Sequence, residues 1–118
     1  MPMTIHELEY RLCKTRRLAA LTYPAVRRIA RNGRLLNVKE GQIIIGPEMG
    51  STSAYVVLEG TVTVVMPWGP VLERLGPGEL FGETSLVERV ERTQYFKAET
   101  DCVLFEIPFQ TFHSDLLA

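Results

Sequence analysis

The residues of this sequence with the clearest capacity for ligand chemistry lie in one stretch, GPGELFGETSLVERVERTQYF. It combines a glycine-rich approach, a turn glycine, a carboxylate and two hydroxyl residues with an arginine-threonine pair beyond a short loop. Main-chain N–H groups at a bend and a guanidinium both attract phosphate, so the pattern indicates an anion-binding turn over residues 81–93. Its candidate ligand-binding residues are Gly82, Glu83, Thr84, Ser85, Arg92 and Thr93.

The residue types fit this chemistry one by one. Gly82 lets the main chain come close to a ligand, and if the chain then bends into one helical turn, the amides of Thr84 and Ser85 converge on an anion. Arg92 can pair with phosphate oxygens through its planar guanidinium. Glu83 can accept a hydrogen bond from a ribose hydroxyl. The turn would then bind both a sugar and a phosphate.

Taken singly, each of these residues also has a purely structural explanation. Gly82 can simply permit a turn, and Glu83 can cap a short helix. Arg92 can pair on the surface with Glu88 or Glu91. The hydroxyl residues are equally suited to turns and strands. The ligand hypothesis therefore depends on the combination.

The length and composition are those of one soluble folding unit, residues 1–118. The 118 residues are 46% apolar and 23% charged, and no apolar run approaches the ~20 residues of a membrane span. Glutamates stand where a secretory signal would have a basic stretch. Cys13 and Cys102 match no metal or redox spacing, so we expect free thiols and a cytoplasmic location.

The charge is distributed unevenly. Residues 1–34 hold eight of the thirteen basic residues and two of the fourteen acidic ones, although the formal net charge of the chain is −1. This excess is explained more simply by a solvated face, or by docking on an acidic body, than by nucleic acid. We expect no direct nucleic-acid contact.

Helical periodicity predicts a two-helix arm over residues 1–34. Thr4, with Glu7 three residues later, forms a capping-box pattern before the first apolar repeat. Pro24 at a first-turn position and the Asn32-Gly33 pair mark the start and end of a second helix. A short helix is expected at the other end, over 108–118.

Between these ends, glycines separate short runs rich in Val, Ile, Leu and Thr over residues 35–107. This spacing is typical of strands, and no helix-length crossover separates them. The predicted fold is therefore mainly β, an eight-stranded antiparallel β-roll or jelly roll with flanking helices. The expected strands are 35–39, 42–46, 54–59, 61–66, 70–75, 79–81, 95–99 and 102–107.

One part of this pattern is especially regular. In AYVVLEGTVTVV, Glu59-Gly60 predicts a tight reversal between two strands. After it, Val62 and Val64 alternate with threonines, as expected of a half-buried strand.

Together, the turn and the strand pattern resemble the cyclic nucleotide-binding domain family, which includes the bacterial catabolite activator protein and the regulatory subunits of protein kinase A. A Phe-Gly-Glu turn and a later arginine followed by Ser, Thr or Ala are typical of that family. Here 81–83 and 92–93 match them. Upstream, 39–44, 48–51 and 55–62 are similar to successive strand and turn positions of the family.

The resemblance implies a cyclic mononucleotide ligand. It assigns the ribose 2′-hydroxyl to Glu83, and the cyclic phosphate to Arg92, Thr93 and the amides near the turn. We favour cAMP over cGMP, although a threonine after the arginine can also hydrogen-bond a guanine amino group. No metal or further cofactor is expected. Candidates for the wall near the base, each equally suited to a plain core role, are Val62, Val64, Leu72 and Leu80.

The sequence departs from the family pattern in several places. Glu91 replaces a frequent proline beside the arginine, Thr84 stands where many members are apolar, and Gln94 and Tyr95 replace small residues. The longer helix that covers the base in many members, and often mediates dimerisation, is not found after 108–118. We expect an attached effector domain or a protein partner, and homodimerisation stays open.

Two other classes of function are weighed against this one. A structural or protein-interaction domain could keep the roll and bind no nucleotide. A small metal-dependent enzyme of cupin type is disfavoured because His6 and His113 lie in the predicted terminal helices rather than inside the roll. We therefore expect a regulatory ligand-sensing domain and no enzyme.

Overall fold

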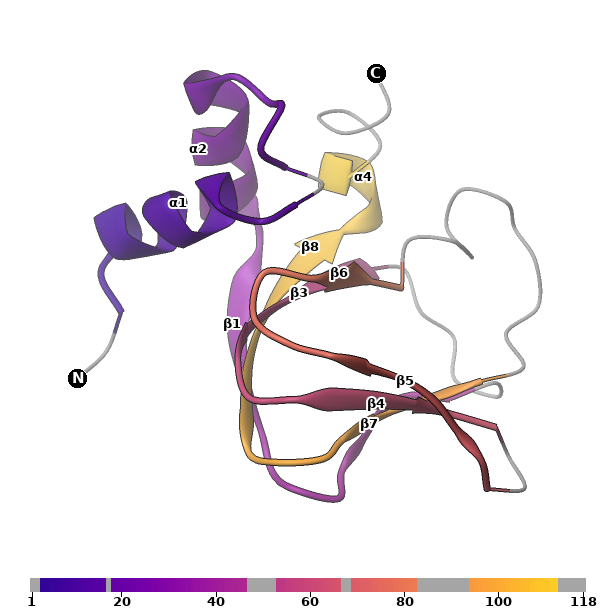
Figure 1. Cartoon of the computed structure of the whole chain (residues 1–118). Coiled ribbons are helices and arrows are strands. Elements are labelled where there is room, and N and C mark those ends of the chain that lie inside the picture. Colours follow the sequence, from indigo (N-terminus) through magenta and orange to yellow (C-terminus); the bar gives the residue numbers. More distant parts are fainter. Residues whose placement is uncertain (1–2, 17, 47–52, 67–68, 83–93, 113–118) are drawn as a thin grey trace.

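The computed structural model describes residues 3–16, 18–46, 53–66, 69–82 and 94–112, and shows two antiparallel sheets beside a pair of helices (Figure 1). The helices are α1 (Ile5–Cys13), α2 (Tyr23–Asn32) and the single turn α4 (Phe109–Phe112). The strands are β1 (Arg34–Val38), β2 (Ile43–Ile45), β3 (Ser53–Glu59), β4 (Val62–Val65), β5 (Val71–Leu75), β6 (Leu80–Phe81), β7 (Tyr95–Ala98) and β8 (Cys102–Pro108).

Each sheet assembles strands that are distant in sequence. The orders are β1-β8-β3-β6 and β2-β7-β4-β5, with every pairing antiparallel. This is the predicted eight-stranded β-roll. Each strand begins and ends within one residue of its expected bounds. The agreement arises because the glycines that punctuate the sequence stand where the strands end.

The predicted reversal at Glu59-Gly60 is not a hairpin. β3 belongs to the first sheet and β4 to the second, so the chain crosses between sheets at this point. Gly60 has a φ of +90°, and a Cβ there would collide with the carbonyl oxygen of Asp101 and lie 2.8 Å from the Sγ of Cys102. Glycine is therefore required here by the positive φ and by the close approach of residues 101–102, and it does not mark a hairpin between β3 and β4.

The expected half-burial of β4 is also wrong. Val62, Thr63 and Val64 are all buried, because β4 lies between β5 and β7 inside its sheet. The hydroxyl of Thr63 donates a hydrogen bond to the carbonyl oxygen of Lys97 at 3.2 Å. This bond satisfies the polar group that alternation would have placed in solvent.

The two N-terminal helices form the predicted arm. The Oγ1 of Thr4 accepts a hydrogen bond from the backbone N–H of Glu7 at 3.1 Å, which caps α1 as expected. α2 begins one residue before Pro24, with Thr22 as its cap, and ends before Gly33. The described part of the C-terminal helix is α4, and positions 113–118 lie outside the described residues.

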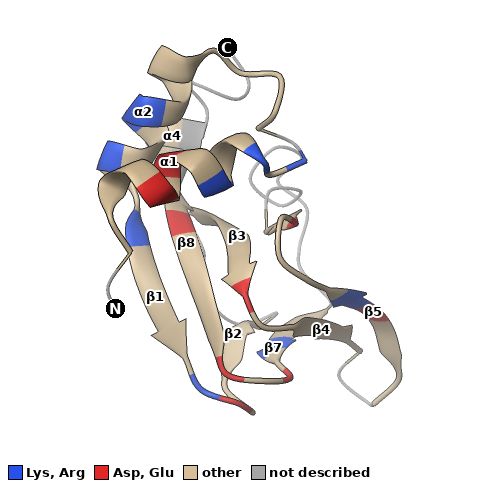
Figure 2. Ribbon diagram, turned by 60° about the vertical axis from the view of Figure 1, so that its left-hand side comes forward, with Lys and Arg blue, Asp and Glu red and all other residues tan. Residues whose placement is uncertain are grey.

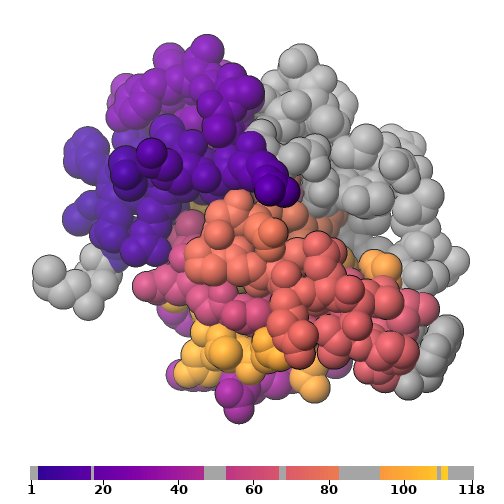
Figure 3. All heavy atoms as spheres, in the orientation of Figure 1, coloured from indigo at the N-terminus to yellow at the C-terminus, as the bar shows by residue number. Residues whose placement is uncertain are grey.

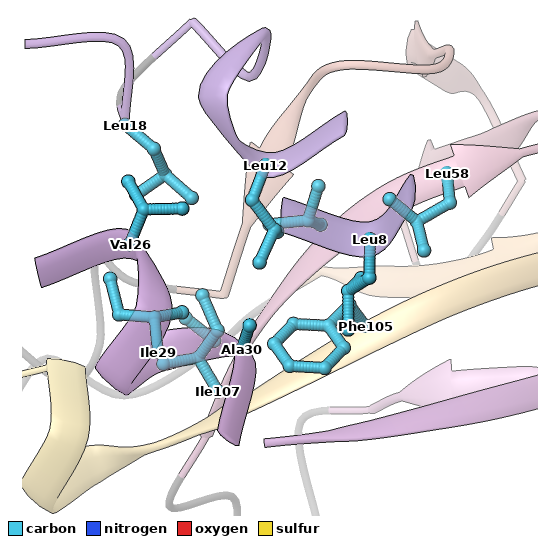
Figure 4. Close-up of a cluster of buried hydrophobic side chains, with 11 residues drawn as sticks. Leu8, Leu12, Leu18, Val26, Ile29, Ala30, Leu58, Phe105 and Ile107 are labelled. Atoms are coloured by element: carbon cyan, nitrogen blue, oxygen red, sulfur yellow. The ribbon is translucent and has the colours of Figure 1, made fainter. Parts of the chain in front are cut away.

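The arm packs on the first sheet through a continuous apolar cluster. Leucines of α1 and the following connection meet α2 side chains and residues of β3 and β8 (Figure 4). The cluster includes Leu8, Leu12, Leu18, Val26, Ile29, Ala30, Leu58, Phe105 and Ile107. Each fully buried side chain of this size contributes about 1.5–3 kcal/mol relative to exposure, so burial fixes the arm on the roll.

A buried carboxylate joins the two helices of the arm. Glu9 of α1 accepts a hydrogen bond from the hydroxyl of Tyr23 at 2.7 Å, and its other oxygen lies 3.9 Å from the Nε of Arg27. The hydrogen bond to Glu9 is the main cause of a raised pKa for Tyr23. The helical periodicity of the sequence predicts only apolar residues on the face of α1 that packs against α2, so it does not predict this carboxylate.

Basic residues of the arm meet acidic ones of the roll at two points. Arg34, the first residue of β1, pairs with Glu106 of β8 at 2.6 Å, and Arg11 of α1 lies 4.0 Å from Glu59 at the end of β3. The arginines of α2 are exposed. Figure 2 shows the basic positions along the helices in blue. Both explanations offered for the basic excess of residues 1–34 therefore apply: some of the basic side chains are exposed to solvent, and others pair with acidic residues of the roll. None of the described helices is long and apolar enough to cross a membrane.

Substitution of Gly60 by alanine tests the crossing between sheets. We expect Gly60→Ala to lower the free energy of unfolding by about 3 kcal/mol, because it adds a collision to the strain of a positive φ. Gly41 provides the matched control, since its φ is +88° and a Cβ there would meet no other atom within 4 Å. Gly41→Ala should cost about 1 kcal/mol. Urea denaturation measures both, and equal losses would contradict the role of the close approach.

Candidate functional site

A cavity of about 390 Å³ opens between the second sheet, β6 and the arm. Its floor and sides come from β4, β5, β6 and the residues entering β7, and the connection after α1 contributes one residue to its rim. The lining residues are Arg16, Val64, Leu72, Glu73, Leu75, Glu79, Leu80, Phe81, Gly82, Gln94 and Phe96. The lining thus combines apolar side chains with the charged groups of Arg16, Glu73 and Glu79.

Three of the four predicted wall residues line this cavity. Val64, Leu72 and Leu80 are among its lining residues, and Leu72 is 51% exposed. Val62 is fully buried in the core cluster between the two sheets and does not line the cavity. Its register partner Leu75 and the partner of Val64, Glu73, both line the cavity, so the cavity reaches this part of β5 without exposing Val62.

Of the predicted ligand-binding residues in the anion-binding turn, the structure describes Gly82. It follows β6 directly, has a φ of +90° and lines the cavity. A Cβ at this position would lie 3.3 Å from the Cδ1 of Ile45 and 3.4 Å from the carbonyl oxygen of Ser53. The chain thus leaves β6 in a conformation that favours glycine, pressed against the roll. The predicted ligand residues Glu83, Thr84, Ser85, Arg92 and Thr93 lie outside the described residues.

A stack of three aromatic rings backs the cavity. The ring centroids of Tyr55 and Phe81 are 5.3 Å apart, and those of Phe81 and Phe96 are 5.1 Å apart, both nearly parallel. Tyr55 and Phe81 are direct register partners in the first sheet, whereas Phe96 lies in the second. The hydroxyl of Tyr55, at the far end of the stack, donates a hydrogen bond to a carboxylate oxygen of Glu106 at 3.0 Å, so this polar group has a partner.

Sequence reasoning missed the aromatic stack for a definable reason. Phe81 stands in the Phe-Gly-Glu motif, but contact with Tyr55 and Phe96 requires strand register and the packing of two sheets. No local spacing carries that information. The usable signal was the aromatic residue directly before the turn glycine.

The sequence analysis also did not predict the charged residues that line the cavity. Glu73, Glu79 and Arg16 line it, and a carboxylate oxygen of Glu79 accepts a hydrogen bond from the backbone N–H of Gly76 at 2.9 Å. Within the described ranges, no three His, Cys, Asp or Glu residues are grouped as metal ligands would be. The described lining therefore combines an apolar surface with two carboxylates and one guanidinium.

The chain matches a known protein-family profile over most of its length. The family profile described as cyclic nucleotide-binding domain matches residues 35–116, which include seven of the eight strands whole and all but the first residue of β1. The chain therefore belongs to the cyclic nucleotide-binding domain family.

Solved structures share this architecture at low sequence identity. The regulatory domain of Toxoplasma gondii protein kinase A, solved with cAMP, is 18% identical with a TM-score of 0.87 over 97% of this chain. A regulatory subunit of a cAMP-independent protein kinase A from Trypanosoma cruzi, bound to guanosine, is 17% identical with a TM-score of 0.87 over 95% of this chain. At these identities the likeness establishes the fold.

The matched proteins are longer than this chain. The chain spans 45% of the Toxoplasma chain and 42% of the Trypanosoma cruzi chain. A curated relative, glutaminase 2 of Bradyrhizobium diazoefficiens, is 33% identical over 72 residues, which are 61% of this chain and 11% of that protein. In each of these proteins the matched region is therefore one part of a longer polypeptide.

The effect of alanine substitutions on stability should distinguish the predicted wall residue that belongs to the core from one that lines the cavity. Val62→Ala removes buried methyl groups, so we expect it to lower the free energy of unfolding by about 2 kcal/mol. Leu72→Ala removes a half-exposed side chain and should change stability by less than about 0.5 kcal/mol. Thermal and urea unfolding of the two variants provide the measurement. A loss for Leu72→Ala as large as that for Val62→Ala would show that Leu72 belongs to the core.

Proposed function

We propose that this domain binds a cyclic mononucleotide in the cavity and acts as a regulatory ligand sensor. The observation that carries the proposal is the cavity itself, which runs from an apolar wall to Gly82. Its volume of about 390 Å³ lies within the range of roughly 300–1,000 Å³ typical of small-ligand sites. The base would contact Val64, Leu72 and Leu80, and the phosphate would lie at the turn that begins with Gly82.

The proposed polar contacts follow the family motif. Glu83 would accept a hydrogen bond from the ribose 2′-hydroxyl, while Arg92, Thr93 and the amides of Thr84 and Ser85 would bind the cyclic phosphate. We favour cAMP over cGMP. The Toxoplasma relative supports cAMP, and the guanosine bound to the Trypanosoma cruzi relative shows that this fold accommodates another purine.

Ligand occupancy would act through populations of conformations and without any bond being broken. A ligand that binds one arrangement of the turn and the arm more tightly shifts the equilibrium toward it, and an attached effector or protein partner responds. The domain would accordingly have no enzymatic activity of its own. We place it in the cytoplasm, where its free thiols stay reduced.

One observation favours a second candidate, a protein-interaction domain that binds no nucleotide. Glu73 and Glu79 place two carboxylates at the cavity, and negative charge near a phosphate site weakens anion binding. In that case the roll would present a surface to a partner and the cavity would stay without a nucleotide.

Calorimetric titration with cAMP, cGMP and 5′-AMP distinguishes the two candidates. We expect binding of at least one cyclic nucleotide, with weaker binding of 5′-AMP. Arg92→Ala should weaken binding by about 1.5–3 kcal/mol, the usual contribution of a charged hydrogen bond. Absence of binding to all three ligands would favour the protein-interaction domain, and unchanged binding by Arg92→Ala would refute its assignment.

The role of Glu83 is tested by a double cycle of protein and ligand. Glu83→Gln and 2′-deoxy-cAMP each remove part of the proposed ribose contact, so we expect each to weaken binding alone. Their combination should lose little more than the larger single effect, because the contact can be lost only once. Isothermal titration of the four pairs measures this coupling. Fully additive losses would place Glu83 away from the ribose.

A further inference from the structure

Arg16 lines the cavity but comes from the N-terminal arm. It lies in the connection that follows α1, far in sequence from the strands and the turn that form the rest of the lining. It is the single lysine or arginine among the described lining residues. In the sequence it is only one of the basic residues that are in excess over 1–34.

The backbone of Arg16 is held firmly in place. Its N–H donates a hydrogen bond to the carbonyl oxygen of Gly78 at 3.2 Å, and the N–H of Gly78 donates to the carbonyl oxygen of Val57 at 2.9 Å. Thr15 and Leu18, on either side, are fully buried. The arm therefore touches the segment before β6 at this point, where Figure 3 shows the violet arm lying against the orange residues of the roll.

The guanidinium of Arg16 is available for a ligand. Arg16 is exposed, and its side chain makes no hydrogen bond or ion pair with the described residues. Two other arginines near the N-terminus are engaged: Arg11 of α1 pairs with Glu7, and Arg34 of β1 pairs with Glu106. An arginine that is fixed by its backbone at a cavity edge loses less freedom when it binds an anion than one on a loose segment.

The guanidinium of Arg16 offsets negative charge at the cavity. Glu73 and Glu79 line the same cavity, so the described lining would carry two negative charges and no positive one without Arg16. A phosphate entering the cavity would then meet only repulsion from these side chains. Arg16 offsets one of the two carboxylates and offers donors to the anion.

We propose that Arg16 binds the anionic group of the ligand, so that the N-terminal arm contributes directly to the binding site. This inference rests on the proposed function, and adds to it a second cation from a different element. Because Arg16 lies on the arm and the ligand in the roll, occupancy of the cavity stabilises the docked position of the arm. The arm is then the part of the domain through which an attached or partner protein detects the ligand.

Calorimetry with cAMP tests the inference on the full chain. Arg16→Ala should weaken cAMP binding about tenfold, which corresponds to about 1.4 kcal/mol, and Arg16→Lys should fall between Arg16→Ala and the parent because it keeps the charge but loses the fork. Arg31→Ala is the matched control, an exposed arginine of the arm that does not line the cavity. It should bind as the parent does. Thermal unfolding verifies that all variants fold.

Two further readouts separate a direct charge effect from a structural one. Affinity of Arg16→Ala for cAMP should depend less on salt than that of the parent, because one charge contact is lost. Adding Glu73→Gln to Arg16→Ala should restore part of the affinity, since it removes a repelling carboxylate. Parental affinity of Arg16→Ala, or its weakening with no change in salt dependence and no rescue, would overturn the inference. Failure of the parent to bind any cyclic nucleotide would instead overturn the proposed function.

Discussion

Three stacked aromatic rings connect the two sheets beside the cavity. Tyr55 and Phe81 come from the first sheet and Phe96 from the second, and both Phe81 and Phe96 line the cavity. Gly82 follows Phe81 directly. The packing of the Phe81 ring therefore positions the start of the proposed anion-binding turn, on which the rest of the proposed site depends.

The arm is the second element on which the site depends. Its apolar cluster covers the first sheet, and its backbone contact with Gly78 brings the connection after α1 to the cavity. The arm thus completes the core with its helices and borders the cavity with the connection between them. The cavity and the docked arm share the segment that leads into β6, which would give the proposed ligand binding a physical route to the exterior of the domain.

The sequence allowed the strands to be predicted more reliably than their partners. Glycines and runs of β-branched residues marked every strand to within a residue, because strand ends are local. Gly60 misled, since a positive φ serves a crossing between sheets as well as a hairpin. Three features depend on long-range packing, which spacing along one chain does not encode: the burial of Val62 away from the cavity, the aromatic stack and the approach of Arg16. The residues of the turn beyond Gly82 remain predictions.

The buried carboxylate of Glu9 has a consequence for how the arm can move. It lies between α1 and α2 and is bonded to Tyr23, with Arg27 close by. Separating the helices would break this hydrogen bond and expose to water the apolar side chains that pack between α1 and α2, which is unfavourable. A displacement of one helix is therefore expected to carry the other with it, so that the two act as one unit.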